Sequence, residues 1–407
     1  MRYVSTRRGS PEVDFATVLM TGLAPDGGLY IPVDIPSLPD GWERWGYVDA
    51  VSWSLESFGV DEPRALVAEA AASFGHPDIA PVLEVADRHV YELFWGPTLS
   101  FKDHALQVLG RLLAREKGGA GPSVAIGATS GDTGSAAIEG CRGQPNLRII
   151  ILYPEGMVSE FQRRQMTTVP DENVMAVAVR GTFDDCQAMV KEALADHEGL
   201  LAVNSINWAR IAAQVGYYLY LGARMGAEFD VAVPTGNFGN AYSCWLAKQI
   251  GVPVGRITLA NNANHLLSDV VAGGGPATTP VKPTLAPAMD IAIPSNFERF
   301  VADPLVEFSA GWAADSEIVA TIASVHDKHD YLLDPHTAIA WKVGGETRTD
   351  KAQVVVSTAH PAKFAGAVAR AIGSEPPLPP GYESVVDRPE RIVTIDADRS
   401  ALNGLIR

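Results

Sequence analysis

Between residues 120 and 260 the chain alternates short apolar runs with longer segments whose apolar residues recur every three or four positions. The apolar runs predict buried strands; they are SVAIGAT, LRIIILYP, VMAVAVRG and FDVAVPT. The segments that follow them predict helices; they are DTGSAAIEGCR, GMVSEFQRRQMTT, TFDDCQAMVKEALADH and NFGNAYSCWLAKQIG. Strands that alternate with helices indicate βαβ units, so we expect an α/β fold with mainly parallel sheets.

Two stretches rich in proline and glycine stand apart from this pattern. VAGGGPATTPVKPTLAP at 271–287 predicts a long surface loop inside a domain. GSEPPLPPGYES at 373–384 predicts a connector to a short C-terminal tail.

Composition narrows the classes of partner. A length of 407 residues favours two or three domains, at ~150 residues each. The formal net charge of −16 argues against nucleic acid or an anionic membrane surface as the main partner. No apolar run is long enough to cross a membrane, and Cys141, Cys186 and Cys244 show no metal-binding spacing. We therefore expect a cytoplasmic protein without a bound metal.

A lysine stands at the predicted start of one helix, in GPTLSFKDHALQVLGRLLARE at 96–116. Ser100 and Asp103 are spaced as a capping box, which predicts a first turn near Phe101. Lys102 then shares a stripe with Leu106, Leu109 and Leu113. The opposite face carries His104, Gln107, Arg111 and Arg115.

The position of Lys102 favours a reactive amine. The positive end of the helix dipole and partial burial both disfavour the ammonium form, so both lower the lysine pKa. A neutral amine can act as nucleophile or base. The alternative is a lysine whose stem covers apolar surface while its charged end reaches water.

Two predicted strand-to-helix junctions suit the binding of anions. AVPTGNFGNAYS at 232–243 places Gly236, Asn237, Gly239 and Asn240 where a helix begins, and backbone N–H groups there can close on a phosphate. AIGATSGDTGSAA at 125–137 repeats the plan with Thr129, Ser130, Gly131, Asp132 and Thr133. Either loop could instead be a tight turn that needs glycine only for its backbone. With the helix-start lysine, the pair indicates a phosphorylated aldehyde cofactor beside an anionic substrate.

Three further motifs are weaker. In NSINWARIAAQVGYY at 204–218, Asn204, Ser205 and Arg210 could converge on a phosphate, or simply begin a capped surface helix. STAHPAKFA at 357–365 could place a hydroxyl against a heterocycle nitrogen, or begin a helix. HDKHD at 326–330 is a conceivable metal pair but lacks a third ligand, and no G-x-S-x-G motif of serine hydrolases is present.

A set of motifs in order along nearly the whole chain resembles the threonine synthases, a family of fold-type II pyridoxal-phosphate enzymes, and specifically their longer bacterial and fungal group. The motifs are YVSTR at 3–7, GLAPDGGLYIP at 22–32, GPTLSFKDHALQ at 96–107, ATSGDTGSAA at 128–137, FDDCQ at 183–187, NSINWARIAAQ at 204–214, PTGNFGN at 234–240, PAMDIAIPSNFERF at 287–300, DPHTAIA at 334–340 and STAHPAKF at 357–364.

The resemblance implies a fold like that of the tryptophan synthase β-subunit: two α/β domains with mainly parallel sheets, an N-terminal subdomain, and pyridoxal phosphate in the cleft between the domains. We expect the N-terminal subdomain over 1–85 and the large cofactor-binding domain over 86–110 and 225–407. Residues 111–224 would form a small mobile domain that closes on the substrate.

The resemblance also implies residue roles. Lys102 corresponds to the Schiff-base lysine, with Phe101 packed beside it, and Thr358 to the hydroxyl that faces the pyridine nitrogen. The cradle for the cofactor phosphate would be Gly236, Asn237, Phe238, Gly239 and Asn240. Residues 129–133 would close on the substrate carboxylate, and Asn204, Ser205 and Arg210 would hold the substrate phosphate.

The implied reaction converts O-phospho-L-homoserine and water to L-threonine and phosphate, by γ-elimination followed by hydration at Cβ. No metal, nucleic acid or membrane is implied, and we expect a monomer or a homodimer. The sequence departs from the family at Trp95, where the family usually has histidine, and it is somewhat short for this group.

Three rival functions remain open from the sequence. The first is a related pyridoxal-phosphate enzyme, either a lyase or a β-replacement synthase that acts on O-phosphoserine, since fold transfers more safely than substrate. The second is a non-catalytic sensor on the same scaffold. The third is a nucleotide-dependent dehydrogenase.

Overall fold

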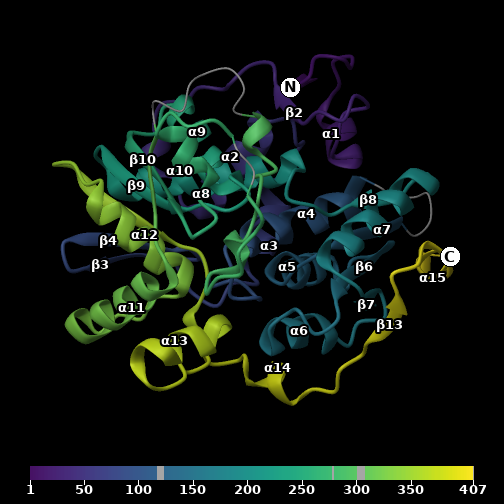
Figure 1. The fold of residues 1–407 in the computed structure, drawn as a ribbon. Helices are drawn as coiled ribbons and strands as arrows, with labels where there is room; N and C mark the ends of the chain where they lie inside the picture. The colour runs from purple at the N-terminus through teal and green to yellow at the C-terminus, as the bar shows by residue number, and fades with distance from the viewer. Residues whose placement is uncertain (117–122, 277–278, 300–307, 407) are drawn as a thin grey trace.

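The strands of the chain form three sheets in the computed structural model, which describes residues 1–116, 123–276, 279–299 and 308–406 (Figure 1). The first sheet has the order β11 (Phe308–Trp312), β10 (Val254–Asn261), β9 (Phe229–Pro234), β12 (Ala352–Ser357), β4 (Arg88–Glu92) and β3 (Val82–Val85). Its neighbours are parallel except for the hairpin β3–β4.

The second sheet is parallel throughout. Its order is β13 (Val393–Asp396), β7 (Val174–Arg180), β6 (Leu147–Pro154), β5 (Ser123–Ala128) and β8 (Leu201–Ala202). Near the N-terminus, β1 (Tyr3–Ser5) and β2 (Tyr30–Pro32) form a separate antiparallel pair.

The strands predicted from the four apolar runs are confirmed as β5, β6, β7 and β9. The helices predicted after them are confirmed as α5 (Asp132–Cys141), α6 (Glu160–Thr167), α7 (Phe183–Asp196) and α9 (Gly239–Ile250). Strand β6, for example, is a continuous apolar run because both of its faces are covered. Ile150 belongs to the core on the α7 side, and Ile149 and Ile151 belong to the core on the other side. The α/β fold with mainly parallel sheets is therefore confirmed.

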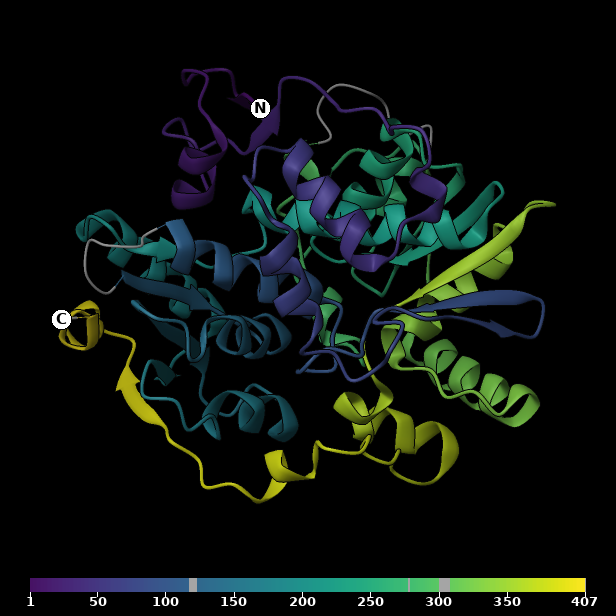
Figure 2. The ribbon, with the colours of Figure 1, turned by 180° about the vertical axis from the view of Figure 1, so that it is seen from behind.

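The remaining helices pack around these sheets. They are α1 (Phe15–Thr21), η1 (Trp42–Arg44), α2 (Tyr47–Ser57), α3 (Arg64–Ala71), α4 (Lys102–Glu116), α8 (Trp208–Met225), α10 (Leu266–Val271), η2 (Pro287–Met289), η3 (Phe297–Arg299), α11 (Asp315–His329), α12 (Pro335–Glu346), η5 (Pro361–Phe364), α13 (Ala365–Ile372), α14 (Glu383–Asp387) and α15 (Arg399–Ile406). Figure 2 shows α2 and α3 on the back of the molecule, where α2 packs on α8 and α3 on α4.

Helices α4 and α5 cross at two glycines. A Cβ added to Gly110 would lie 2.1 Å from the carbonyl oxygen of Gly140, and one added to Gly140 would lie 2.1 Å from the carbonyl oxygen of Leu106. The two backbones are thus in direct contact, which no residue larger than glycine would allow. This crossing fixes the relative position of the N-terminal ends of α4 and α5, where Lys102 and Asp132 lie.

The C-terminal segment is more structured than the predicted short tail, because it contains α14, β13 and α15. After the loop at 373–382 the chain runs along the outside of the molecule to the second sheet (Figures 1 and 2). There Val393 pairs with Val177 and Ile395 with Val179, and Leu402 is buried in the core beside α7. The predicted loop at 271–287 is confirmed for its described residues, since α10 ends at Val271 and η2 begins at Pro287; residues 277–278 lie outside the described part.

Candidate active site

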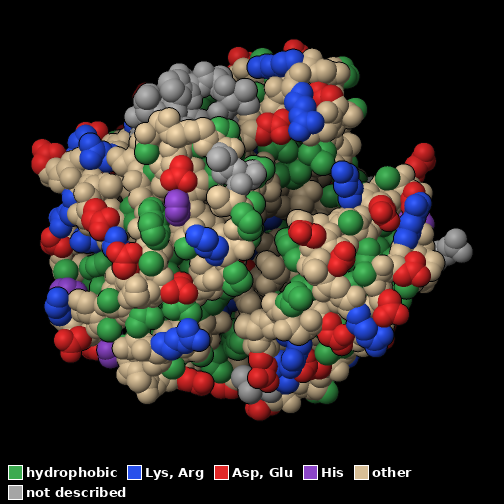
Figure 3. Space-filling model, in the orientation of Figure 1, with side chains coloured by type: hydrophobic (Ala, Val, Ile, Leu, Met, Phe, Trp, Pro, Cys, Tyr) green, Lys and Arg blue, Asp and Glu red, His purple; other side chains and the backbone are tan. Residues whose placement is uncertain are grey.

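A cavity lies at the carboxyl ends of β4, β9 and β12, where ligands bind in open α/β sheets. The space between its lining residues, including the part open to solvent, is about 700 Å³. A deep hollow between two halves of the molecule is visible in Figure 3. The cavity is lined by Phe101, Lys102, Asp132, Thr133, Ser205, Arg210, Gln214, Pro234, Thr235, Gly236, Asn237, Phe238, Gly239, Asn240, Ala241, Ala288, Met289, Asn296, His336, Thr358 and Ala359.

Lys102 is the first residue of α4, as the sequence predicts. Its side chain is only 13% exposed, its Nζ lies 3.3 Å from Oδ2 of Asp132, and it lies 4.9 Å from the centre of the Phe101 ring. Burial lowers the pKa of Lys102 below its ordinary value; Asp132 opposes this effect, and Lys363 and Arg210 add to it. Burial therefore shifts Lys102 toward the neutral amine, against the effect of Asp132.

The predicted capping box before α4 is wrong: Oγ of Ser100 accepts the N–H of Lys102 at 3.4 Å, while the N–H of Asp103 donates to the Ser100 carbonyl oxygen. The Asp103 carboxylate accepts hydrogen bonds from the backbone N–H and hydroxyl of Thr98, at 2.8 and 2.9 Å, and not from the N–H of Ser100. Leu99 has a positive φ of 59°, so the chain turns sharply before the helix and brings Thr98 to the carboxylate. Burial raises the pKa of Asp103 to about 7, although Thr98 and Lys363 oppose this.

The helix face opposite Lys102 is also buried in its first half. His104 and Gln107 are each 1% exposed. Nε2 of His104 lies 3.0 Å from the Leu93 carbonyl oxygen, which only accepts, so Nε2 carries the proton and Nδ1 accepts the Tyr47 hydroxyl at 2.6 Å. His104, from the polar stripe predicted on this face, therefore bonds to internal partners rather than to water.

The loop at 235–240 forms one end of the cavity. Phe238 has a positive φ of 63°, and α9 begins at the next residue. A Cβ added to Gly236 would lie 2.8 Å from the Ala288 carbonyl oxygen, so backbone fills the space that a side chain would need. Oδ1 of Asn240 accepts the hydroxyls of Tyr217 and Tyr218, while its Nδ2 has no hydrogen-bond partner in the described part of the chain. A helix N-terminus with a free buried donor suits a phosphate.

A buried arginine stands apart from this loop. Arg210 is 3% exposed, and burial lowers its pKa to about 10, which still leaves it positively charged near neutral pH. It donates to the Asn204 carbonyl oxygen at 2.7 Å, and its Nε is without a hydrogen-bond partner among the described residues. A buried cation with a free donor at a cavity wall suits a second anion. Ser205 lines the cavity beside it, whereas the side chain of Asn204 caps its own loop through the N–H groups of residues 206 and 207.

Only part of the predicted loop at 129–133 lies in the cavity wall, and other residues of the loop hold its shape. Asp132 and Thr133 line the cavity, and Ser130 is exposed and outside the lining. The Thr129 hydroxyl is buried and bonds to the backbone of Gly131 and Gly134, so it shapes the loop. Gly131 is buried too, with a φ of 151°.

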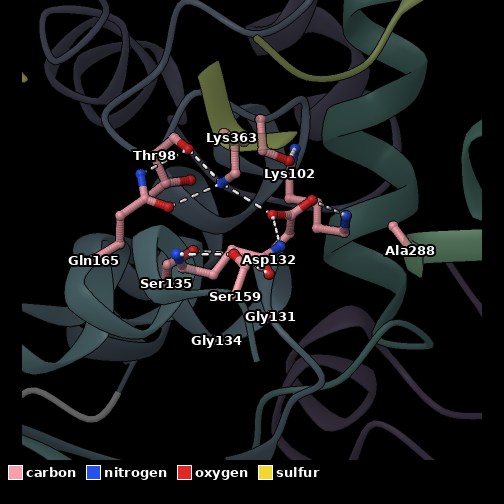
Figure 4. A network of polar contacts seen from close by, with 12 residues as sticks. Thr98, Lys102, Gly131, Asp132, Gly134, Ser135, Ser159, Gln165, Ala288 and Lys363 are labelled. Atoms are coloured by element: carbon pink, nitrogen blue, oxygen red, sulfur yellow. Dashed lines mark hydrogen bonds and ion pairs between the residues drawn. The ribbon is translucent and has the colours of Figure 1, made fainter. Parts of the chain in front are cut away.

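Asp132 is held by side chains from three elements (Figure 4). Its Oδ2 meets Lys102, and its Oδ1 accepts Gln162 at 2.8 Å and lies 3.0 Å from Nζ of Lys363. Burial alone would raise the pKa of Asp132, but Lys363 and Lys102 outweigh burial and hold it below the ordinary range. The carboxylate is therefore ionised.

Several residues at or near the site are not predicted from the sequence. Asn296, within a motif of unassigned role, donates to the carbonyl oxygens of Ser205 and Asn237 and so connects the segment at 204–210 with the loop at 235–240. Next to it, Glu298 pairs with Arg7 of the YVSTR motif. The motif PAMDIAIPSNFERF, which contains Asn296 and Glu298, ends at residue 300, and that residue lies outside the described part. Gln214, His336, Gln162 and Lys363 were missed as well, although DPHTAIA and STAHPAKF contain two of them.

The remaining predictions also have definite places. Thr358 lines the cavity, and its carbonyl oxygen accepts the N–H of Phe101. Trp95 is not in the cavity lining; its indole N–H donates to Glu92 at 2.8 Å, and its ring lies 5.3 Å from those of His76 and Phe94. Over the described ranges no group of three or more His, Cys, Asp or Glu side chains is placed to hold a metal, and no helix there is long and apolar enough to cross a membrane.

Known proteins resemble this chain along its whole length. The family profile described as "Pyridoxal-phosphate dependent enzyme" matches residues 91–359, and profiles of the threonine synthase N terminus and C-terminal region match 2–56 and 337–406. Threonine synthase from Pseudomonas aeruginosa is 39% identical, over 100% of this chain and 98% of the relative. Threonine synthase from Schizosaccharomyces pombe is 36% identical over 91% and 89%.

Solved structures agree. Pyridoxal-phosphate-bound threonine synthase from Brucella melitensis has a TM-score of 0.95 and 38% identity, with 100% of this chain and 98% of that chain covered. The Escherichia coli threonine synthase has a TM-score of 0.89 and 32% identity, with coverage of 100% and 99%. These likenesses show that the chain belongs to the threonine synthase family of pyridoxal-phosphate dependent enzymes.

Proposed function

We propose that this chain is a threonine synthase whose substrate is O-phospho-L-homoserine, which it converts with water to L-threonine and phosphate. The observation that carries this proposal is the pair of anion-binding segments on one cavity, the loop at 235–240 and the Arg210 region, with Lys102 in the same wall. A phosphorylated cofactor and a phosphorylated substrate need two such places.

The residues present fit pyridoxal phosphate. The free Nδ2 of Asn240 and the N-terminus of α9 support the loop at 235–240 as the holder of the cofactor phosphate. Lys102 would hold the aldehyde carbon covalently, with Phe101 beside it. Thr358 would offer a hydroxyl to the ring nitrogen, and a neutral hydroxyl leaves that nitrogen mostly unprotonated. When bound, the cofactor stabilises negative charge at the substrate carbon beside the amino group.

The amine of Lys102 would move the protons. In its neutral form it can remove the proton from Cα of the substrate and then one from Cβ. The C–O bond at Cγ breaks and phosphate leaves, taking up a proton. A proton is added to Cγ, water bonds to Cβ through its oxygen and gives up one proton, and Cα regains a proton. The low pKa that burial gives Lys102 supports this role.

The phosphate of the substrate would lie against Arg210 and Ser205, with the loop at 129–133 near its carboxylate. Arg210 is buried and has an unused donor, so it can orient the leaving group and stabilise its charge as it departs.

Residues 111–224, which include all the strands of the second sheet except β13, would form the small domain that closes on the substrate. The large domain would comprise 86–110 and 225–407, and the N-terminal subdomain 1–85. Since β13 joins the second sheet, closure would carry the C-terminal segment along.

The three cysteines are free and buried, which supports a reducing compartment, and we propose that the protein is cytoplasmic. We also propose that it is a monomer or a homodimer, on the family resemblance alone. The proposed function is tested by incubation with O-phospho-L-homoserine while phosphate and threonine are followed together. Equal amounts of both products support the proposal. Turnover of O-phosphoserine in place of phosphohomoserine would instead assign the chain to a related lyase or synthase.

A further inference from the structure

Two lysines face one carboxylate in the wall of the cavity. Lys102 from α4 and Lys363 from η5 lie 3.3 and 3.0 Å from the two oxygens of Asp132 (Figure 4). The two lysine side chains differ in burial, since that of Lys363 is 0% exposed and that of Lys102 is 13% exposed. Only Lys102 lines the cavity.

The two lysines differ in their hydrogen-bond partners. An ammonium group has three N–H donors and no acceptor. Nζ of Lys363 meets three acceptors: the carbonyl oxygen of Thr98 at 2.5 Å, Oε1 of Gln165 at 3.0 Å and Oδ1 of Asp132 at 3.0 Å. Loss of its proton would leave two N–H donors for these three buried acceptors and would remove the positive charge beside Asp132, which is costly. Nζ of Lys102 meets a single oxygen in the part of the chain described, Oδ2 of Asp132.

We propose that Lys363 is a positioning residue: its ammonium group is the permanent counter-ion of Asp132 and leaves Lys102 as the amine that gives up its proton. If Asp132 faced Lys102 alone, a closed one-to-one ion pair would hold Lys102 as ammonium. With Lys363 in place the carboxylate is already neutralised. This role rests on the proposed function of Lys102 as the reacting amine.

The other charged groups around this cluster fit the same assignment. Arg210 from α8 adds positive potential at Lys102, which further disfavours a second cation there. Asp103 from α4 is near enough to interact with Lys363, but its carboxylate is bound by Thr98. Gln162 from α6 is uncharged and donates to Asp132, so it adds no competing charge.

The cluster also joins the two sheets. Lys363 follows β12 of the first sheet, whereas Asp132 follows β5 of the second and Gln165 lies on α6. The bonds of Lys363 therefore cross the boundary between the two parts, and the charge of Lys102 is set only when both parts are in contact.

The test is an NMR titration of isotope-labelled lysine side chains in the full chain freed of cofactor, so its result does not depend on turnover of any substrate. In the wild-type protein we expect Lys102 to lose its proton at a lower pH than an ordinary lysine does. If Lys102 keeps its proton as an ordinary lysine does, the proposal is overturned.

Variants sharpen this test. In Lys363→Met the midpoint of the Lys102 titration should rise by about 1 pH unit, because Lys102 becomes the only counter-ion of Asp132. Lys363→Arg, which keeps the charge, should hold the midpoint near the wild-type value. Lys351→Met, at an exposed ion pair with Glu228, is the matched control and should change nothing. An unchanged or lowered midpoint in Lys363→Met would overturn the proposal; if that variant does not fold, the wild-type titration decides.

Discussion

The hydroxyl of Tyr217 donates a 2.6 Å hydrogen bond to Oδ1 of Asn240, and Tyr218 donates a second bond of 2.7 Å to the same oxygen. Both acceptor positions of that oxygen are then used, so the amide is fixed in orientation. Its other end, Nδ2, has no partner in the described part of the chain and belongs to a residue of the cavity wall. Two core tyrosines of α8 thus hold a free donor where a phosphate is expected.

Asn240→Asp should weaken cofactor binding at least 10-fold, or about 1.4 kcal/mol. The carboxylate still accepts both tyrosine hydroxyls, but it replaces the free donor with a negative charge that repels phosphate. Equilibrium dialysis of pyridoxal phosphate against the cofactor-free protein measures this. Asn403→Asp, on α15 and bonded to His197, is the control and should leave the affinity unchanged. Equal affinity in Asn240→Asp would remove Asn240 from the cradle.

Gly236→Ala should lower both cofactor retention and stability, the latter by about 1–3 kcal/mol. The added Cβ would lie 2.8 Å from the Ala288 carbonyl oxygen, so the loop must move. Gly366→Ala, in α13 with no atom near its added Cβ, should be neutral or stabilising by about 0.5–1 kcal/mol. Urea unfolding and cofactor dissociation rates measure the two effects. A cradle that tolerates alanine at 236 would contradict the close backbone approach.

Arg210→Gln should lower kcat/KM for O-phospho-L-homoserine, because a buried charge-assisted donor to the phosphate is lost. The decrease should correspond to about 2–4 kcal/mol of lost transition-state stabilisation. Steady-state kinetics on the phosphorylated substrate measure the change. Arg224→Gln, in the exposed last turn of the same helix, is the control. If turnover does not depend on Arg210, the assignment of the substrate phosphate to this segment is wrong.

His104 should make stability depend on pH. Burial lowers its pKa to about 3, whereas an unfolded histidine has a pKa near 6.5. Between about pH 6.5 and about pH 3, His104 carries a proton in the unfolded chain but not in the folded chain. Stability contributed by neutral His104 is therefore lost as the pH falls through this range, by at most about 1.4 kcal/mol per pH unit.

Urea unfolding at several values between pH 4 and 7 tests this. His104→Gln should show a flatter dependence than the wild-type protein, since other groups contribute equally to both. Tyr47→Phe removes the hydrogen bond that holds Nδ1 as an acceptor and so should raise the folded pKa of His104; the loss of stability should then be smaller and end at a higher pH. Identical slopes in all three proteins would show that His104 does not titrate in this way.

The parts of the site that the sequence predicts are local in the chain. Lys102 and the loop at 236–240 each combine a strand end or turn with a helix start within a few residues, and their chemistry follows from that short stretch. The alternating pattern likewise predicts β5, β6, β7 and β9, because a parallel sheet buried on both faces requires continuous apolar strands.

What the sequence does not predict depends on contacts between distant segments. Lys363 bonds to Gln165, 198 positions away, and from the sequence it is simply a lysine near a helix start. The pairing of β13 with β7 is equally hidden, since a short alternating strand at the chain end carries no sign of its partner. Conversely, Ser130 and Asn204 share motifs with cavity residues, yet the turn of each loop leaves them out of the lining.

The central claim is that a single amine, on Lys102, holds the cofactor. Reduction of the cofactor-loaded protein with borohydride, followed by peptide mass analysis, tests it most directly. We predict a stable phosphopyridoxyl label on residue 102 in the wild-type protein and no label in Lys102→Ala. A label on Lys363 or any other lysine, or no label in the wild-type protein, would contradict the account.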